Sequence, residues 1–115
     1  MKREQATAAR RRLVLDAALE LYQEGGEAAI TIEALATRSA TSVGSLYHHY
    51  QGKEGILIAL YQQCLEDYRE SSRQALSGVA DAETLVKRLV KHYLLWVEEH
   101  PGASRLLFRE RHSQA

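Results

Sequence analysis

The sequence predicts an all-α protein, and three observations support that prediction. Apolar residues recur every three to four positions through almost the whole chain, which is the period of an amphipathic helix. No segment alternates apolar and polar residues with the period of two that a half-buried strand requires. Helix-ending signals separate the apolar stretches, at Gly25-Gly26, at Gly78 and at Pro101-Gly102. We therefore expect a series of helices without a sheet.

The first expected helix runs from about residue 4 to residue 24. Gly25 and Gly26 end it, because glycine adopts the left-handed conformation of a C-terminal cap at little steric cost. Its expected core-facing stripe consists of apolar residues at helical spacing, namely Ala6, Ala9, Leu13, Val14, Ala17, Ala18, Leu21 and Tyr22.

Residues 31–50 predict two short helices separated by a tight turn. Thr31 and Ser42 are suited to be their N-caps, because a hydroxyl oxygen can accept a hydrogen bond from a free backbone N–H at a helix start. The polar residues of 38–41 interrupt the apolar stripe between them, and Leu46 of the second helix is expected in the core. Two helices around a turn of three to four residues form a helix-turn-helix, whose second helix enters the DNA major groove.

Three further helices are expected after residue 52. The first is long, fades between residues 70 and 77, and stops by Gly78. Asp81 is suited to cap the next one, and a final run spans Ser104 to Arg111 after a break at Pro101. The Asp81-capped helix has an expected core face of Leu85, Leu89, Val90, Tyr93, Leu94 and Val97, with Trp96 off its centre. Few residues remain to cover the last two amphipathic helices.

Composition sets the class of protein. A length of 115 residues supports one domain, or one small domain and part of another. The formal net charge of zero is lower than is usual for a DNA-binding protein, although the first dozen residues are strongly basic. A single cysteine, Cys64, excludes an internal disulfide and fits a reducing compartment. Because no long apolar run occurs, we expect no membrane-spanning helix, no signal peptide and a cytoplasmic location.

The motif order is a long helix, a GG stop, T-x-x-x-L-A, and then S-x-G-S-L-Y-x-H-Y-x-G-K-E-x-x-L. At these residues the chain resembles the tetracycline-repressor (TetR) family of bacterial transcription regulators, from about Arg11 to Leu60. The resemblance implies a three-helix DNA-binding head at residues 1–52 and a partial helical ligand-binding and dimerisation domain at residues 53–115. It further implies a homodimeric repressor on a palindromic double-stranded DNA operator, released by a small-molecule effector. The matching positions are Thr31, Ala36, Ser42, Gly44, Leu46, Tyr47, His49, Tyr50 and Lys53.

The expected DNA contacts fall into two groups. Val43, Gly44, Ser45 and His48 would face base edges, because the first three are small enough for close approach and apolar or hydrogen-bonding contact. The others would bind phosphates or adjoin the turn, and the full set of expected DNA-binding residues is Thr31, Thr41, Ser42, Val43, Gly44, Ser45, Tyr47, His48, His49 and Lys53. No Arg or Lys lies between Ser42 and Tyr50, so phosphate contacts and DNA shape are expected to outweigh direct base readout.

Some of these residues also have plainer interpretations. Tyr47 is alternatively a core tyrosine with a hydrated hydroxyl, and Lys53 a solvated charge. The basic N-terminal segment either lies along the DNA backbone or is a solvated helix start, and Arg38 is equally open. His48 and His49 point to different helix faces, so no metal site is expected.

Two departures from the family pattern stand out. Ala40 and Thr41 occupy turn positions where the family has glycine and an apolar residue. A left-handed Ala40 would cost about 1 kcal/mol, so the turn either accepts that cost or adopts another geometry. Family members are also generally much longer, so the chain is either a truncated or a naturally short member.

Outside the head, the aromatic residues Tyr61, Tyr68, Tyr93, Trp96 and Phe108 are candidates to line an effector pocket, although aromatics at helical spacing more often form a core. Cys64 is expected to be a buried small hydrophobe. No catalytic motif and no cofactor motif occurs, so an enzyme is not expected. The alternative to a specific regulator is a truncated, non-enzymatic helical interaction module with weak or non-specific DNA binding, which the exposed apolar faces after Asp81 would favour.

Overall fold

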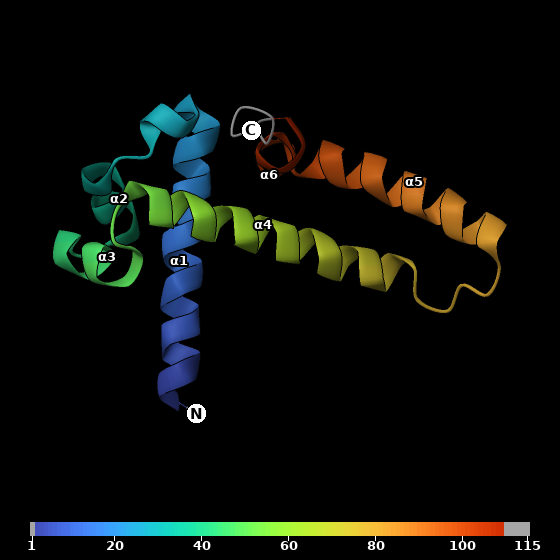
Figure 1. Ribbon diagram of the computed structural model, residues 1–115, viewed down its shortest axis with the longest axis horizontal. Helices are drawn as coiled ribbons and strands as arrows, with labels where there is room; N and C mark the ends of the chain where they lie inside the picture. Colours follow the sequence, from blue (N-terminus) through green and yellow to red (C-terminus); the bar gives the residue numbers. More distant parts are fainter. Residues whose placement is uncertain (1, 110–115) are drawn as a thin grey trace. The chain divides into compact units, whose positions relative to one another are not determined.

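The computed structural model describes the backbone of residues 2–109 and the side chains of residues 5–108. The expected all-α fold is confirmed: the described residues form six α-helices with short 3-10 and π segments, and no strand (Figure 1). The chain divides into two compact units, residues 1–60 and residues 61–115, with the division inside the long helix α4 (Lys53–Ala75). Lys2, Arg3 and Glu110 to Ala115 have side chains outside the described residues.

Helix α1 (Lys2–Gly25) is the spine of the first unit. Its predicted end is confirmed, and Gly26 has a φ of 74° before the 3-10 turn η1 (Glu27–Ala29). The predicted stripe was wrong at its start, because Ala6, Ala9 and Leu13 are exposed. Leu13 is 65% exposed, whereas Leu15 is fully buried. The buried face is therefore centred on Val14, Leu15, Ala18, Leu21 and Tyr22, rotated relative to the expected one.

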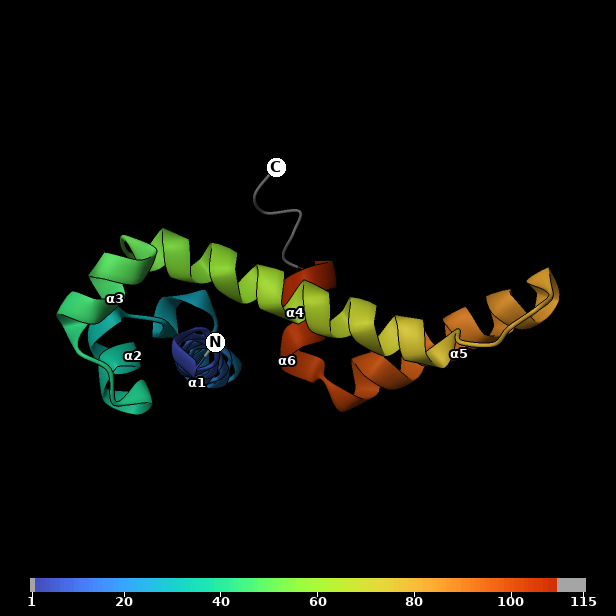
Figure 2. The ribbon, with the colours of Figure 1, turned by 90° about the horizontal axis from the view of Figure 1, so that it is seen from below.

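Helices α2 (Ile32–Ser39) and α3 (Val43–Tyr50) lie together on one side of α1 (Figure 2). Both predicted N-caps are confirmed. The Ala34 N–H donates to Thr31 Oγ1 at 3.1 Å, and the Ser45 N–H donates to Ser42 Oγ at 3.1 Å. Their apolar faces meet the core through Leu35 and Leu46, whose exposures are 0% and 1%. The two helices are thus fixed to the α1 spine by buried leucines.

The turn between α2 and α3 keeps the left-handed geometry in spite of its alanine. Ala40 has φ 53° and ψ 40°, so the other geometry that the sequence left open is not used. Its N–H donates to the carbonyl of Thr37, and the Thr41 N–H donates to that of Ala36 at 3.0 Å. These hydrogen bonds close the last turn of α2 and offset part of the cost of about 1 kcal/mol for a left-handed L-residue.

An ion-pair cluster joins α2 to the end of α1. The guanidinium of Arg38 donates to both carboxylate oxygens of Glu24, at 3.0 Å for the longer bond, and lies 3.5 Å from Glu20. The hydrogen bond from Arg38 lowers the pKa of Glu24. Arg38 is therefore held on the side of the unit where α1 ends, in favour of its structural interpretation over a DNA contact.

The first turns of α4 complete the first unit. Ile56 and Leu60 are fully buried, and Ala59 is 6% exposed. Because these residues pack within the first unit, the structural division falls after Leu60. The expected domain boundary at residue 52 marked the end of the three-helix head and stays a prediction.

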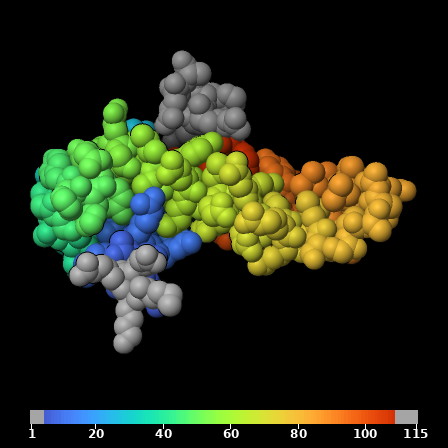
Figure 3. Space-filling view, turned by 60° about the horizontal axis from the view of Figure 1, so that its bottom comes forward, coloured from blue at the N-terminus to red at the C-terminus, as the bar shows by residue number. Residues whose placement is uncertain are grey.

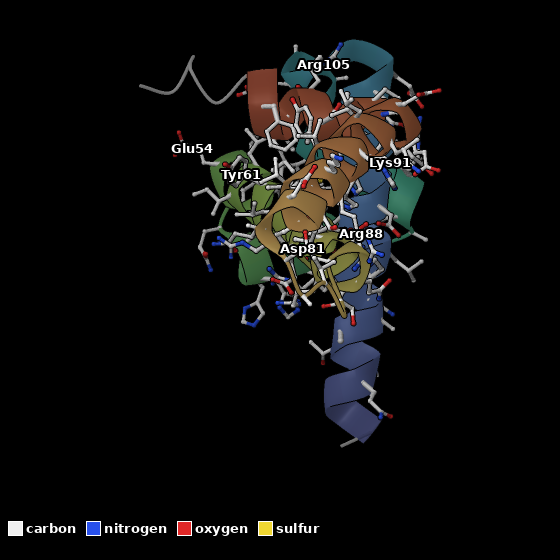
Figure 4. The ribbon with its side chains drawn as sticks, turned by 90° about the vertical axis from the view of Figure 1, so that its right-hand side faces the viewer. Glu54, Tyr61, Asp81, Arg88, Lys91 and Arg105 are labelled. Carbon is white, nitrogen blue, oxygen red and sulfur yellow. The ribbon has the colours of Figure 1, made fainter. Side chains whose placement is uncertain are left out.

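The second unit is an antiparallel pair, made of α4 from Tyr61 onward and α5 (Ala82–Glu99), followed by α6 (Pro101–Ser104) and the π segment η2 (Arg105–Arg109) (Figure 1). Asp81 caps α5 as predicted, accepting from the Thr84 N–H at 2.8 Å, and this hydrogen bond lowers the pKa of Asp81 (Figure 4). The final run was expected to start at Ser104. It starts at Pro101, because proline fits the first position of a helix, where its missing N–H costs nothing.

The predicted core face of α5 was wrong at five of its six residues, and the sixth, Val97, is half-buried. Leu85, Leu89, Val90, Tyr93 and Leu94 are between 39% and 60% exposed. Trp96, which was expected off-centre, is instead the buried residue of this helix, at 3% exposure. The reason is that α5 turns its Trp96 side toward Tyr68 of α4, with ring centroids 4.9 Å apart. Cys64 is buried, as predicted.

Candidate nucleic-acid interface

The outward surface of α3 carries the residues expected to face base edges. Val43 is 42% exposed, and Gly44 and His48 are exposed as well. A Cβ at Gly44 would meet no atom within 4 Å, so the backbone there is open to close approach. Ser45 is half-buried. Ser42, also exposed, uses its hydroxyl oxygen for the N-cap and leaves the first N–H groups of α3 pointing outward.

One flank of α3 adjoins the start of α4. Tyr47 is 52% exposed, so its ring is not part of the core, and the alternative interpretation as a core tyrosine does not hold. A Cβ at Gly52 would lie 3.9 Å from Tyr47 Cε1, so Tyr47 sits over the connection into α4. Lys53 is the first residue of α4. The structure thus brings Tyr47 and Lys53 to the same flank, beside a helix N-terminus that favours an anion.

The other flank of α3 forms a cleft with α1. The cleft has a volume of about 270 Å³. Figure 3 shows the blue side chains of α1 beside the green atoms of α3 on this face. Its lining residues come from α1, from the turn and from α3, namely Ala6, Thr7, Arg10, Arg11, Val14, Thr41, Ser45, Leu46, His49 and Tyr50.

The arginines of α1 differ in their partners. Arg12 lies 3.8 Å from the carboxylate of Asp16, one turn along the same helix. Among the described side chains, no carboxylate lies within 4.0 Å of Arg10 or Arg11, and both are exposed. Burial raises the pKa of the Tyr50 hydroxyl, and the positive charge of Arg11 opposes that rise. The cleft is therefore electropositive.

Two expected DNA contacts lie away from the open surface of α3. Thr41 is only 8% exposed, and its hydroxyl donates to the Ser39 carbonyl at 3.3 Å, which gives it a structural role in the turn. Thr31 is exposed at the start of α2, with its hydroxyl oxygen in the N-cap. DNA contact by either residue stays a prediction.

The sequence shows the basic start of the chain but does not by itself single out Arg10 and Arg11. A signal was available in principle, because Arg10 and Arg11 are followed by Arg12 and then by Asp16, an acidic residue four positions after Arg12. That spacing pairs Arg12 along the helix and leaves the other two without an i,i+4 partner. Their place beside α3 follows only from the packing of α1.

The expected effector residues partly gather in the second unit. Tyr68, Trp96 and Phe108 contact each other edge to face, with centroids 4.9 to 6.4 Å apart, and Tyr93 lies 5.3 Å from Phe108. Tyr61 is not part of this cluster. The ring of His92 is tilted relative to that of Tyr68, with centroids 5.3 Å apart, and His92 is hydrogen-bonded to Ser71 at 2.8 Å and to Ser72 at 3.3 Å. These ring contacts do not by themselves define a cavity, so an effector pocket here stays a prediction.

Within the described residues, no group of three or more His, Cys, Asp or Glu side chains is placed to hold a metal ion. In the same part of the chain, no helix combines the length and the apolar character needed to cross a membrane.

Comparison with known proteins gives consistent matches. Residues 14–60 match the profile of the family described as bacterial regulatory proteins, tetR family. The transcriptional regulator UidR of Escherichia coli is 30% identical over 77 residues, which cover 67% of this chain and 39% of that protein. The transcriptional repressor KstR2 of Rhodococcus jostii is 36% identical over 81 residues, covering 67% and 40%. The chain thus spans about two fifths of the length of these relatives.

Solved structures also resemble this one. A TetR-like transcriptional regulator from Rhodococcus sp. RHA1 has a TM-score of 0.81 at 23% identity, covering 93% of this chain and 58% of that one. A TetR-family regulator from Streptomyces coelicolor has a TM-score of 0.75 at 29% identity, covering 91% and 63%. The first match concerns the fold alone. The second adds sequence similarity to the same fold.

Proposed function

Because the chain belongs to the TetR family of bacterial regulatory proteins through residues 14–60, we propose that it is a sequence-specific DNA-binding transcriptional regulator rather than an enzyme. In this proposal it is a cytoplasmic repressor that binds a palindromic double-stranded operator as a homodimer and leaves it when a small-molecule effector binds. The relatives named above are called regulators or repressors, which supports the same class of function.

The observation that carries the proposal is the surface of α3. A capped helix of eight residues, Val43–Tyr50, presents exposed small and polar side chains outward while Leu46 and Tyr50 anchor it to the core. A left-handed turn at Ala40 sets it against α2, as a helix-turn-helix requires. Such a helix can enter the major groove with its N-terminal residues against base edges.

The division of labour within this surface is testable. Lys53 would bind a phosphate, so Lys53→Ala should weaken binding about equally on all DNA sequences and reduce the salt slope by about 0.9. Ser45 would read a base edge, so Ser45→Ala should relax the preference at one position of the site. Arg69→Ala provides a matched loss of one exposed positive charge on α4 outside the first unit.

The experiment begins with selection of bound duplexes from a random pool by the purified protein, followed by fluorescence anisotropy on the selected duplex and on a scrambled one at several salt concentrations. We expect a palindromic consensus and preference for the selected duplex. Equal affinity for both duplexes at moderate salt would refute sequence-specific regulation.

The effector part of the proposal rests on the aromatic cluster. Tyr68, Tyr93, Trp96 and Phe108 would have to rearrange to admit a ligand, whereas Tyr61 is half-buried outside the cluster. Trp96 is the single tryptophan of the chain, so its fluorescence reports directly on this cluster. A screened small molecule that both shifts Trp96 emission and releases DNA would support the proposal, and a molecule that releases DNA without any change in emission would argue for another site.

A second candidate function, association through α5, is favoured by one observation. Val86, Val90, Leu94 and Leu95 line an exposed apolar groove together with Lys87 and Lys91. The partner in this hypothesis is a second copy of the chain. The middle of α5 carries Lys87, Arg88 and Lys91, the last two labelled in Figure 4, and its end carries Glu98 and Glu99. An antiparallel pair would place the acidic end of one helix beside the basic middle of the other.

Sedimentation velocity tests this pairing. Reversing Lys87 and Lys91 to glutamate should weaken association, and adding Glu98→Lys with Glu99→Lys should restore it. A wild-type protein that stays monomeric across the accessible concentration range would rule the pairing out.

A further inference from the structure

We propose that α1 belongs to the DNA interface, and that its cleft with α3 holds a backbone phosphate on the strand opposite the one bound at Tyr47 and Lys53. The proposal rests on the DNA-binding function proposed above and adds a second phosphate site to it. The residues that carry it are Arg10 and Arg11 of α1 with His49 of α3.

The position of the cleft follows from the turn of α3. Ser45 and His49 are four residues apart, so they share one side of the helix, and both line the cleft with α1. Tyr47 lies about half a turn away from both and is packed over Gly52, at the start of α4. Gly44 and His48 lie between these two flanks and are exposed. The outward ridge of α3 is thus bordered by polar and charged side chains on each side.

The width of the DNA major groove explains why both flanks of α3 would meet phosphates. The major groove is about 12 Å wide, and an α-helix with its side chains is about 10–12 Å in diameter. A helix in the groove therefore nearly fills it and meets one sugar–phosphate backbone along each flank. In this arrangement Lys53 contacts the backbone on the α4 side of α3, and the cleft contacts the backbone on the α1 side.

The chemistry of the cleft matches a phosphate. Arg10 and Arg11 have no carboxylate partner among the described side chains, so their charge is available to a ligand. A guanidinium presents a planar fork of donors that can bind two phosphate oxygens at once. His49 is exposed at the rim and adds a ring nitrogen. The two arginines of α1 thus supply the positive charge that α3 lacks, because α3 contains no Arg or Lys.

The neighbouring Arg12 is a natural control. It lies on the same helix and carries the same charge, but it is paired with Asp16 at 3.8 Å and does not line the cleft. If positive charge acted on DNA binding in a general way, Arg12 and its neighbours would contribute equally. If a phosphate is held in the cleft, Arg10 and Arg11 contribute and Arg12 does not.

The test compares three proteins by fluorescence anisotropy: the wild type, the double variant Arg10→Ala with Arg11→Ala, and Arg12→Ala. The probes are the selected duplex and a random-sequence duplex. The double variant should lower the slope of log affinity against log salt by about 0.9 for each phosphate that the protein no longer neutralises, with equal weakening on both probes. Arg12→Ala should leave the slope unchanged.

Single methylphosphonate substitutions, which remove the charge of one phosphate, locate the site on the DNA. Within one half-site of the selected duplex, one neutralised phosphate on each strand should weaken binding of the wild type. In that half-site, the double variant should lose its sensitivity on one strand only, and Lys53→Ala should lose it on the other. Because Arg10 and Arg11 are exposed, both variants should keep the wild-type circular dichroism; if the alanine variant does not, Arg10→Gln with Arg11→Gln replaces it.

The outcomes separate this inference from the proposed function. If the wild type binds no DNA, the DNA-binding function fails and this inference fails with it. If the wild type binds and the double variant keeps the wild-type salt slope, α1 is outside the interface and only this inference is overturned. Loss of sensitivity on the same strand of one half-site for Lys53→Ala and for the double variant would also overturn it.

Discussion

The two units of the chain treat their apolar residues in opposite ways. In the first unit, the segments from α1 to the start of α4 pack a common core that includes Leu15, Ile30, Leu35 and Leu46 at 0 to 1% exposure. In the second unit, α5 leaves seven large apolar residues exposed and buries Trp96 alone. The large buried residues of the first unit therefore form a shared core, whereas most of the apolar face of α5 is left exposed.

The difference extends to electrostatics. In the first unit, Arg38 ties α2 to α1 through Glu24 and Glu20, so an ion pair reinforces a tertiary contact. In the second unit, Arg73 pairs with Glu66 and Glu70 within α4, and Lys87 pairs with Glu83 within α5. Such pairs support the helix that contains them and do little to fix its neighbours.

The largest expected effect comes from the same substitution in each unit. Leu35→Ala removes a fully buried side chain from the first unit and should cost about 2–5 kcal/mol in the free energy of unfolding. Leu94→Ala removes a side chain that is 60% exposed and should cost less than about 0.5 kcal/mol. Urea unfolding followed by circular dichroism measures both.

Trp96 fluorescence sharpens this test, because the single tryptophan reports on the second unit. In Leu35→Ala, the circular dichroism transition should shift to lower urea more than the fluorescence transition does. A loss for Leu94→Ala as large as that for Leu35→Ala would mean that α5 is covered in solution.

Substitutions at two left-handed backbone positions should have smaller effects on stability, with opposite signs in the two units. Ala40→Gly relieves a φ of 53° and should stabilise the first unit by about 0.5–1 kcal/mol, after the greater flexibility of glycine in the unfolded chain is counted. Gly78→Ala imposes strain at a φ of 76° and should destabilise the second unit by about 1 kcal/mol. Thermal unfolding compares the two, and a destabilising Ala40→Gly would show that the turn relies on the alanine methyl group.

The smallest effect is a pH dependence. The pKa of Glu24 is held below its ordinary 4.5 by Arg38, so the stabilisation is fully present above the unfolded value and is lost as pH falls through the lower, folded pKa. Glu24→Gln should therefore flatten the decline in stability below about pH 4.5 relative to the wild type. Glu27→Gln, at an exposed position of η1, serves as the control. Identical pH profiles for wild type and Glu24→Gln would contradict a contribution from the pair.

Local rules predicted the parts of the fold that depend on neighbouring residues. Thr31, Ser42 and Asp81 were recognised as caps because capping involves only the next three residues. The burial of Leu15 in place of Leu13 was not predictable, since the phase of an apolar stripe depends on where another helix packs. The same limit applied to α5, whose periodicity was correct while the surface to cover it is not among the described residues.

The candidate site likewise has a part that local sequence predicts and a part that depends on tertiary packing. The exposure of Val43, Gly44 and His48 agrees with their predicted outward orientation, although their contact with DNA stays a prediction. The cleft joins Arg10 to Ser45, which are far apart in the sequence, and no spacing rule links such positions. Only the packing of α1 against α3 brings them together.

The exposed face of α5 has a practical consequence when it is combined with the charge of the chain. The formal net charge is zero and the isoelectric point is about 7.0. Near neutral pH, two molecules therefore meet without long-range repulsion, and the apolar faces of α5 can adhere. Colloidal stability should be lowest close to neutrality and should improve on either side of it, so a buffer moderately away from pH 7.0 is the better choice for concentrated samples.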